Sequence, residues 1–395
     1  MARSATLLGW MLLFSAGSQA QQVSSKAPPL SPQETVNSMD IQSGYRMVPV
    51  LAEPHIHEPS AIAWDRNGRM YVVEMRTYMQ DIDGQNQFAP ASRVSRHEDT
   101  DGDGLYDKHT VFADKLVLPR MVLPLRDRVL IRETNTLDLK SYQDLDGDGV
   151  ADRIELVHQG GPRGGNLEHQ PSGLIWNIDN WLYTAMSPFR YRVTEGKIIR
   201  DRMPGSSGQW GLTHDNVGRL FYSFAGGENP VADFQRPLVY GHLRLPGEQA
   251  PGFREVFPID DIPDTQGGRG RLRANNTLNH FTASCGQSIF RGDRLPLGFH
   301  GDLIICEPVG RLIRRAKVTN DKGKIIVSNA YDKQEFIAAR DPNFRPINSA
   351  TGPDGCLYLV DMYRGIIQEG NWVRSGSYLR GIVKEYELEK NIGRG

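Results

Sequence analysis

The chain has 395 residues, with 46 lysines and arginines against 47 aspartates and glutamates. This balance leaves no excess positive charge, which excludes functions that need a strongly basic surface, such as binding of nucleic acid or of an anionic membrane. A hydrophobic content of 39%, with 41 glycines and 24 prolines, is typical of a loop-rich all-β protein, and an all-β ring can use this length as one domain.

Residues 1–20 have the pattern of a secretory signal peptide. Arg3 provides a positive start, LLGWMLLF is an apolar run, and small residues precede the expected cleavage after Ala20. The apolar run is short for a bilayer span, so an uncleaved anchor is the less favoured interpretation. We expect a periplasmic or secreted protein without a membrane span after cleavage. The polar, Pro/Ser-rich residues 21–43 are expected to form a flexible leader.

One short pattern recurs from residue 60 onward: an apolar stretch, a polar turn with Asp, Asn or Gly, and a second apolar stretch. Each copy is typical of two short strands around a tight turn. Four clear and two looser copies occupy residues 60–74, 121–133, 172–185, 210–223, 287–307 and 347–361. One hairpin cannot bury its own apolar face, so the six copies predict an all-β fold, a six-bladed β-propeller, over residues 44–388.

The stretches outside this pattern have their own expected roles. Residues 225–284 lack regular spacing and are rich in Gly, Pro and Asp, which predicts a long insertion between the fourth and fifth blades. The alternating stretches 46–52 and 378–388 flank the repeats, and we expect them to pair and close the ring. Residues 389–395 would be a short tail.

The chain has three cysteines and no CxxCH string, so it carries no c-type haem motif. Cys285 precedes the first strand of the fifth hairpin, and Cys306 ends its second strand. Matched ends of antiparallel neighbours bring β-carbons to about 4–5 Å, so we expect these two residues to face each other and to be able to form a disulfide. Cys356 begins a strand near the opposite face and is expected to be a free thiol.

Two nearly identical loops, DTDGDGLYD at 99–107 and DLDGDGVAD at 144–152, each crowd four aspartates into nine residues. Such carboxylates repel one another without a cation, and Ca²⁺ prefers oxygen ligands of this kind. The flanks alternate like strands, so these are hairpin tips rather than EF-hands, and a plain Asp-Gly turn is the alternative. The second loop has Glu155 at its twelfth position where the first has Thr110, so we expect the second to bind more tightly. The expected ligands are Asp99, Asp101, Asp103, Asp107, Asp144, Asp146, Asp148, Asp152 and Glu155.

His169 is the best catalytic candidate. It lies just before a first strand, and the residues at that end of each hairpin should gather at one mouth of the ring. A histidine there can accept a proton from a substrate hydroxyl, and the adjacent Glu168 is placed to orient it. A hydrogen-bonded structural histidine is the alternative interpretation.

Long strings in the chain resemble known families. HQPSGLIWNIDNWLY at 169–183 resembles the segment around the catalytic base of soluble quinoprotein glucose and sorbosone dehydrogenases, H-x-x-G-R-L-x-x-x-x-D-x-x-L-Y. The strings at 282–315 and 336–368, with the paired DGDG loops, are similar to the propeller domain of large secreted planctomycete proteins called membrane-bound dehydrogenase-like. This resemblance covers nearly all of residues 44–388.

The resemblance implies a dehydrogenase that uses pyrroloquinoline quinone (PQQ) and Ca²⁺ to oxidise a sugar or alcohol and passes electrons to an external acceptor such as a cytochrome c. His169 matches the general base. No motif for the cations that clamp the quinone is present, so Arg132, Arg345 and Arg364 are nominated from their place at the mouth. Of the R-N-P string of the glucose enzymes, only Asn229 and its following proline remain.

A non-catalytic, calcium-stabilised propeller that binds glycans or proteins is the alternative function. A deep mouth in which His169 and two or more cations converge would favour the enzyme, and a shallow, open face would favour the binding module.

Overall fold

The computed structural model describes residues 27–395, so the expected signal peptide at residues 1–20 lies outside the described residues. The described strands form six antiparallel sheets, which confirms the all-β fold class. All six hairpins expected from the sequence form the first two strands of these sheets: β2 (Pro59–Trp64) with β3 (Met70–Glu74), β6 (Pro119–Pro124) with β7 (Val129–Glu133), β10 (Ser172–Trp176) with β11 (Leu182–Ala185), β14 (Leu212–His214) with β15 (Leu220–Phe224), β17 (Cys285–Ile289) with β18 (Leu303–Glu307), and β22 (Pro346–Thr351) with β23 (Leu357–Asp361).

Further strands extend five of the six sheets outward. They are β4 (Ser92–Glu98), β5 (Lys108–Leu116), β8 (Leu139–Gln143), β9 (Arg153–His158), β12 (Phe189–Thr194), β13 (Lys197–Arg202), β16 (Asn229–Ala232), β19 (Leu312–Asp321), β20 (Lys324–Asn329), β21 (Ile337–Ala339) and β1 (Met39–Ile41). The helices are α1 (Pro32–Asn37), α2 (Tyr378–Glu385) and the short 3₁₀ turns η1 (Ala225–Gly227), η2 (Leu238–Tyr240), η3 (Gly268–Arg271), η4 (Leu297–Phe299) and η5 (Leu388–Lys390).

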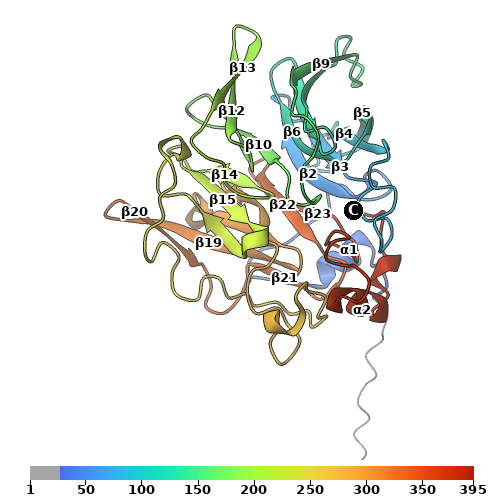
Figure 1. Cartoon of the computed structure of the whole chain (residues 1–395), viewed down its shortest axis with the longest axis vertical. Helices are drawn as coiled ribbons and strands as arrows, with labels where there is room; N and C mark the ends of the chain where they lie inside the picture. Colours follow the sequence, from blue (N-terminus) through green and yellow to red (C-terminus); the bar gives the residue numbers. More distant parts are fainter. Residues whose placement is uncertain (1–26) are drawn as a thin grey trace, which may run out of the picture.

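The first strands of the sheets contact one another in a closed cycle, β2, β6, β10, β14, β17, β22 and back to β2 (Figure 1). The sheets therefore surround one axis as the blades of a propeller do, and we number the blades 1 to 6 in this order. The turn in blade 1 shows why the repeats fold locally. The Asp65 carboxylate accepts hydrogen bonds from the backbone N–H groups of Asn67 and Arg69, and Gly68 adopts a φ of +80°, which favours glycine.

The expected closure by pairing of residues 46–52 with 378–388 is wrong. Residues 46–52 contain no strand, and residues 378–385 form α2. The helix forms because the Ser377 side chain caps its first turn and because Leu379 and Val383 bury one face. The C-terminal residues instead approach the entry to β2, where the Gly395 carbonyl accepts a hydrogen bond from the Glu53 backbone N–H at 2.9 Å.

The two stretches expected to be irregular are also more ordered than predicted. Within the expected flexible leader, residues 32–41 form α1 and β1, and β1 pairs with β21. The expected insertion at 225–284 contributes β16 to blade 4, and it buries Phe234, Phe253 and Phe281 in one apolar cluster with β18 and β19. Among the described residues, no helix has the length and apolar character needed to cross a membrane.

Candidate functional site

The two ends of each hairpin meet at one face of the ring, which we call the mouth. The strand register pairs Pro59 with Glu74, Pro119 with Glu133, and Pro346 with Asp361. The first residue of each first strand therefore lies beside the last residue of the second strand, as the sequence pattern predicts.

His169 precedes β10 at this mouth and is half-buried. Its backbone N–H donates to Asn166 Oδ1 at 2.9 Å, whereas its imidazole ring forms no hydrogen bond with any described residue. A β-carbon added at Gly226 would lie 2.8 Å from His169 Nε2 and 3.0 Å from Gln209 Oε1. Gln209 Oε1 accepts a hydrogen bond from the Gly226 backbone N–H at 2.8 Å. The His169 imidazole, the Gln209 amide and the Gly226 backbone therefore lie together, and we call these three residues the His169 cluster.

Glu168 does not orient His169, contrary to the expectation from the sequence. Its carboxylate accepts hydrogen bonds from the Glu369 backbone N–H at 2.8 Å, from Trp372 Nε1 at 2.8 Å and from the Tyr78 hydroxyl at 3.3 Å. Burial raises the pKa of Glu168 to about 7. Glu168 therefore holds a neighbouring segment in place and contributes nothing to the free imidazole.

That neighbouring segment, residues 364–372, is a strap that sequence reasoning missed. The Ile367 carbonyl accepts a hydrogen bond from Tyr78 in blade 1, and the Gln368 side chain donates to the Asp264 carbonyl in the insertion. With the Glu168 contacts ahead of blade 3, the strap connects three separate parts of the ring. The segment has no periodic apolar pattern, so only its long-range contacts identify it.

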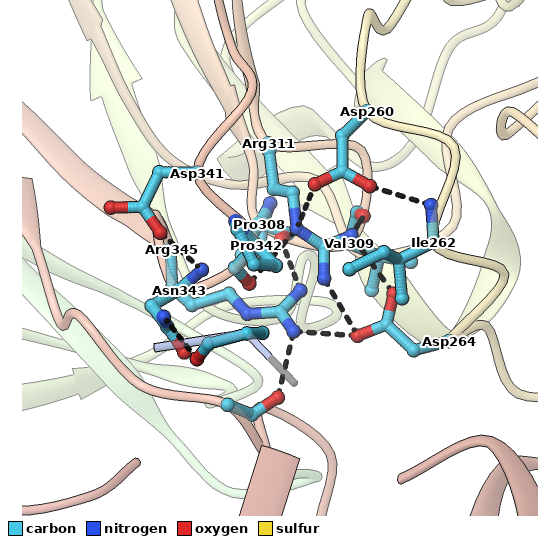
Figure 2. Close-up of polar contacts among 12 residues, drawn as sticks. Asp260, Ile262, Asp264, Pro308, Val309, Arg311, Asp341, Pro342, Asn343 and Arg345 are labelled. Carbon is cyan, nitrogen blue, oxygen red and sulfur yellow. Dashed lines mark hydrogen bonds and ion pairs between the residues drawn. The ribbon is translucent and has the colours of Figure 1, made fainter. Parts of the chain in front are cut away.

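Arg345 belongs to a buried ion-pair network at the base of this strap (Figure 2). Its guanidinium lies 2.5 Å from Asp264 Oδ2 and donates to the carbonyls of Pro308 and Gly365. Asp264 also pairs with Arg311 at 2.8 Å. Asp264 thus lies between two guanidinium groups that are each almost fully buried.

The other nominated quinone ligands also have protein partners. Arg364 Nη1 lies 2.6 Å from Glu58 Oε2, and its Nη2 donates to the Met79 carbonyl. Arg132 donates to the Tyr191 hydroxyl at 2.8 Å, and Asn229 accepts from Gln249 at 2.7 Å. Arg132, Arg345 and Arg364 are at most 3% exposed. They pair with different groups and do not converge on His169.

One further arginine supports the His169 segment directly. Arg120 stacks 3.9 Å above the Trp210 ring and donates to the backbone carbonyls of Leu167 and Glu168. Its burial lowers its pKa to about 9. Arg120 therefore fixes the backbone that carries His169 and presents no free charge to a ligand.

Acidic residues at the ends of four second strands make the same type of hydrogen bond in each of four blades. In each case the carboxylate accepts a backbone N–H from the segment that leads into the same blade. The pairs are Glu74 with His57 at 3.0 Å, Glu133 with Val117 at 2.7 Å, Glu307 with Thr282 at 3.0 Å and Asp361 with Arg345 at 2.7 Å. These carboxylates close the blades at the mouth, which explains part of its acidic composition without any catalytic role.

The DGDG loops form the tips of the β4–β5 and β8–β9 hairpins, on the face opposite the mouth. In blade 1, β4 reaches its tip where His97 pairs with Met70, at the start of β3 rather than at its mouth end. The ligand atoms of Asp99, Asp101 and Asp103 lie within 4.8 Å of one another, and so do those of a second group, Asp144, Asp146 and Asp152. Both groups have the oxygen chemistry that suits Ca²⁺.

The two loops differ in their surroundings. Asp144 Oδ2 lies 3.1 Å from Arg96 Nη1, whereas Asp99 accepts hydrogen bonds only from the Gly102 and Gly104 backbone among the described residues. Glu155 lies within β9 and forms an ion pair with Arg153 at 2.6 Å. Glu155 is therefore not one of the clustered carboxylates, although the sequence placed it at the twelfth position. Asp107 and Asp148 accept backbone hydrogen bonds inside their own loops.

A family model described as Domain of unknown function (DUF7133) matches residues 31–395. The chain belongs to the DUF7133 family. No curated protein matches it in sequence.

Among solved structures, the DUF7133 chain is similar to the PQQ domain of pyranose dehydrogenase from Coprinopsis cinerea. The two are 14% identical over 82% of this chain and 94% of the other, with a TM-score of 0.49. Soluble aldose sugar dehydrogenase from Escherichia coli is 14% identical, over 79% and 96% of the chains, with a TM-score of 0.48. A carbohydrate-active enzyme of family AA12 from Trichoderma reesei is 12% identical, over 83% and 96%, with a TM-score of 0.47. The activities in these names are those of the compared proteins.

Two of the three cysteines of the DUF7133 chain are paired in register at the mouth. Cys285 lies opposite Cys306 across β17 and β18, which confirms that they face each other. All three cysteines are free thiols in this structure, and Cys356 is the more exposed one. Burial raises the pKa of Cys306 to about 12.

Proposed function

We propose that this protein is a periplasmic or secreted binding propeller that takes a sugar-like, polyhydroxylated ligand at the His169 cluster. The observation that carries the proposal is the half-buried imidazole of His169, which has no hydrogen-bond partner among the described residues and lies beside the Gln209 amide. Neutral groups that both donate and accept hydrogen bonds complement hydroxyl groups. In this proposal, Ca²⁺ binds at the DGDG tips and has a structural role.

The residues nominated for PQQ do not fit that cofactor. The quinone carries carboxylates, which need cations with free donors. Arg345 and Arg364 instead direct their guanidinium groups to Asp264 and Glu58. Arg132 donates one hydrogen bond, to the Tyr191 hydroxyl, and its Nε has no partner among the described residues. Freeing Arg364 would leave the buried Glu58 carboxylate without its cation, which is costly, and freeing Arg345 would remove one of the two cations of Asp264. This conflict favours the binding module over the enzyme.

A quinone-dependent sugar or alcohol dehydrogenase is the second candidate. The free imidazole favours it, because a general base must have an unoccupied nitrogen within reach of a substrate hydroxyl. This candidate requires a PQQ contact set other than the nominated residues, and an external electron acceptor such as a cytochrome c.

A matched pair of glycine variants tests the proposed site. Gly226→Ala places a methyl group 2.8 Å from His169 Nε2, whereas the nearest atom to a β-carbon at Gly227 is Phe224 Cβ at 3.4 Å. Calorimetry with a panel of mono- and oligosaccharides should show binding that is lost in Gly226→Ala and His169→Ala and kept in Gly227→Ala. Binding that is equal in all three variants would place the ligand elsewhere.

Titration with PQQ, followed by its absorbance, separates the two candidates. We expect no saturable binding in the presence of Ca²⁺. Saturable PQQ binding, together with dye-linked sugar oxidation that disappears in His169→Ala, would establish the dehydrogenase instead.

A further inference from the structure

Strand β23 is partly exposed where its five counterparts are buried. Every residue of β3, β7, β11 and β18 is buried, and β15 has a single half-buried residue, Phe224. In β23 only Val360 is buried. The cause is the number of strands: a third strand covers the second one in the other five sheets, whereas β22 and β23 form a two-stranded sheet. Blade 6 therefore ends on an open edge.

A cavity of about 1060 Å³ lies beside this open edge. All five residues of β23 line it, together with residues 44–53 and the loop 102–105. Residues 44–53 pass the edge without a backbone hydrogen bond to β23. A strand edge with unpaired N–H and C=O groups is a template for another strand.

The carboxylate at the end of β23 lacks a cation that two of its three counterparts have. The third counterpart, Glu307 of blade 5, accepts only backbone N–H groups among the described residues. In blade 1, Glu74 accepts the His57 N–H with one oxygen and pairs with Arg93 of β4 through the other, at 2.8 Å. In blade 2, Glu133 accepts the Val117 N–H and pairs with Lys140 of β8, also at 2.8 Å. In both blades the cation comes from the third strand.

Asp361 is the equivalent residue of blade 6. Its Oδ1 accepts the backbone N–H groups of Arg345 at 2.7 Å and Tyr363 at 2.8 Å, and its Oδ2 has no hydrogen bond to a described residue. Asp361 lines the cavity. Burial raises the pKa of Asp361 to about 7, as expected for a carboxyl group that lacks its cation.

The negative charge of the cavity lining that remains for a partner lies at Asp354 and Asp361. The acidic lining residues are Glu53, Asp354 and Asp361, besides Asp99 and Asp103 of the first DGDG loop, whose charge a bound Ca²⁺ would neutralise. The basic lining residues are Arg46 and Arg294. Glu53 is already paired with Arg394. Four of the five third strands that cover the equivalent edges carry basic residues, as in SRVSRHE of β4 and LIRRAK of β19, whereas β16 reads NPVA.

We propose that the open edge of β23 binds an extended segment of a second polypeptide, which adds the missing third strand to blade 6 and places a lysine or arginine on Asp361. Main-chain hydrogen bonds along the edge would supply affinity, and the apolar lining and Asp361 would select the sequence. The segment has basic residues separated by small or apolar ones, as Ser95 and Val94 separate Arg93 from Arg96 in β4. A small apolar ligand would leave the edge unpaired, and a second copy joined through its own β23 would bring no cation to Asp361.

A labelled peptide with the sequence of Ser92–Glu98 is the probe, because it already fills the equivalent place in blade 1. Fluorescence anisotropy measures its binding to the whole protein, and amide hydrogen exchange locates it. We expect exchange to slow within Leu357–Asp361, and we expect Asp361→Asn to weaken binding about tenfold, the usual loss for a charge-assisted hydrogen bond. Asparagine keeps the Oδ1 acceptor for the two backbone N–H groups, so the blade should stay folded.

Two controls make the outcome decisive. Glu133→Gln changes the equivalent carboxylate of a blade that already has its third strand, so it should leave peptide affinity unchanged. A peptide with Arg93→Gln should bind the wild type and Asp361→Asn equally. The proposal is overturned if β23 shows no slower exchange at millimolar peptide, or if Asp361→Asn binds the arginine peptide as well as the wild type does. Protection of β23 that grows with protein concentration alone would also overturn it, in favour of a second copy.

Discussion

Asp264 binds Arg311 through two parallel hydrogen bonds, Oδ1 to Nη1 at 2.8 Å and Oδ2 to Nη2 at 3.0 Å, with both side chains about 1% exposed. The same carboxylate pairs with Arg345, and Asp260, also in the insertion, lies 3.3 Å from Arg311. Two carboxylates of the insertion therefore face two guanidinium groups of the propeller (Figure 2). The arginines keep the pKa of Asp264 below its usual range in spite of its burial.

Replacing this carboxylate should be strongly destabilising. Asp264→Asn removes the charge without changing the shape and leaves two buried guanidinium groups undercompensated, so we expect a loss of about 3–5 kcal/mol in the free energy of unfolding. Urea denaturation measures this loss. Asp261→Asn, an exposed neighbour in the same segment, is the control and should stay within about 0.5 kcal/mol of wild type. A loss below about 1 kcal/mol in Asp264→Asn would show that the network does not hold the insertion in place.

Glu307 should make the protein less stable as the pH rises. Burial raises its pKa from 4.5 to about 7, so between these values the native carboxyl group holds a proton that the unfolded one has released. This contribution to stability is complete below pH 4.5 and is lost as the pH rises through 7. Across that window the free energy of unfolding of the wild type should fall by up to about 3 kcal/mol relative to that of Glu307→Gln, because the glutamine side chain does not titrate.

Thermal or urea unfolding of both proteins at several pH values between 4.5 and 8 tests this expectation. Glu155→Gln, at a position whose side chain is 41% exposed, is the matched control and should follow the wild-type profile. Parallel stability profiles for wild type and Glu307→Gln would refute the assignment.

The local parts of the fold could be predicted from the sequence, and the long-range parts could not. The hairpin at 60–74 is set by its apolar alternation and by the Asp65–Gly68 turn, both of which are adjacent in the chain. The role of Arg345 depends on Asp264, which is 81 residues away, and that of Arg364 depends on Glu58, which is 306 residues away. The sequence around a polar residue at a strand end does not show whether its side chain faces a ligand or a buried protein partner.

The same reasoning explains the outcome at His169 and at the ring closure. The position of His169 at the mouth follows from the hairpin register, but the direction of the Glu168 side chain depends on Trp372, 204 residues later. Apolar and polar residues alternate in part of residues 378–388, which suggests a strand. Packing of Leu379 and Val383 against the core makes most of this stretch a helix.

Cys285 and Cys306 should become crosslinked when the protein folds in an oxidising compartment. They are register partners, and a crosslink that closes a loop of about 20 residues is worth about 3 kcal/mol. Once folded, the buried thiols should react slowly, because the raised pKa of Cys306 leaves little thiolate. Mass spectrometry of unreduced peptides should find the Cys285–Cys306 link in wild type and in Cys356→Ser. Three free thiols after oxidative folding would rule it out.

The first DGDG loop should bind Ca²⁺ more tightly than the second. Glu155, the reason to expect the reverse order, is held by Arg153 in β9. Asp144 also shares its charge with Arg96, a cation that competes with Ca²⁺, whereas no basic side chain among the described residues is bonded to Asp99. Calorimetry should therefore show that Asp101→Ala no longer has the tighter Ca²⁺ site and that Asp146→Ala no longer has the weaker one. Arg96→Gln should bind Ca²⁺ more tightly at the second loop. Ca²⁺ binding to the native state alone also raises thermal stability by mass action, so chelation should lower it. Equal melting temperatures with Ca²⁺ and with a chelator would identify both loops as ordinary Asp-Gly turns.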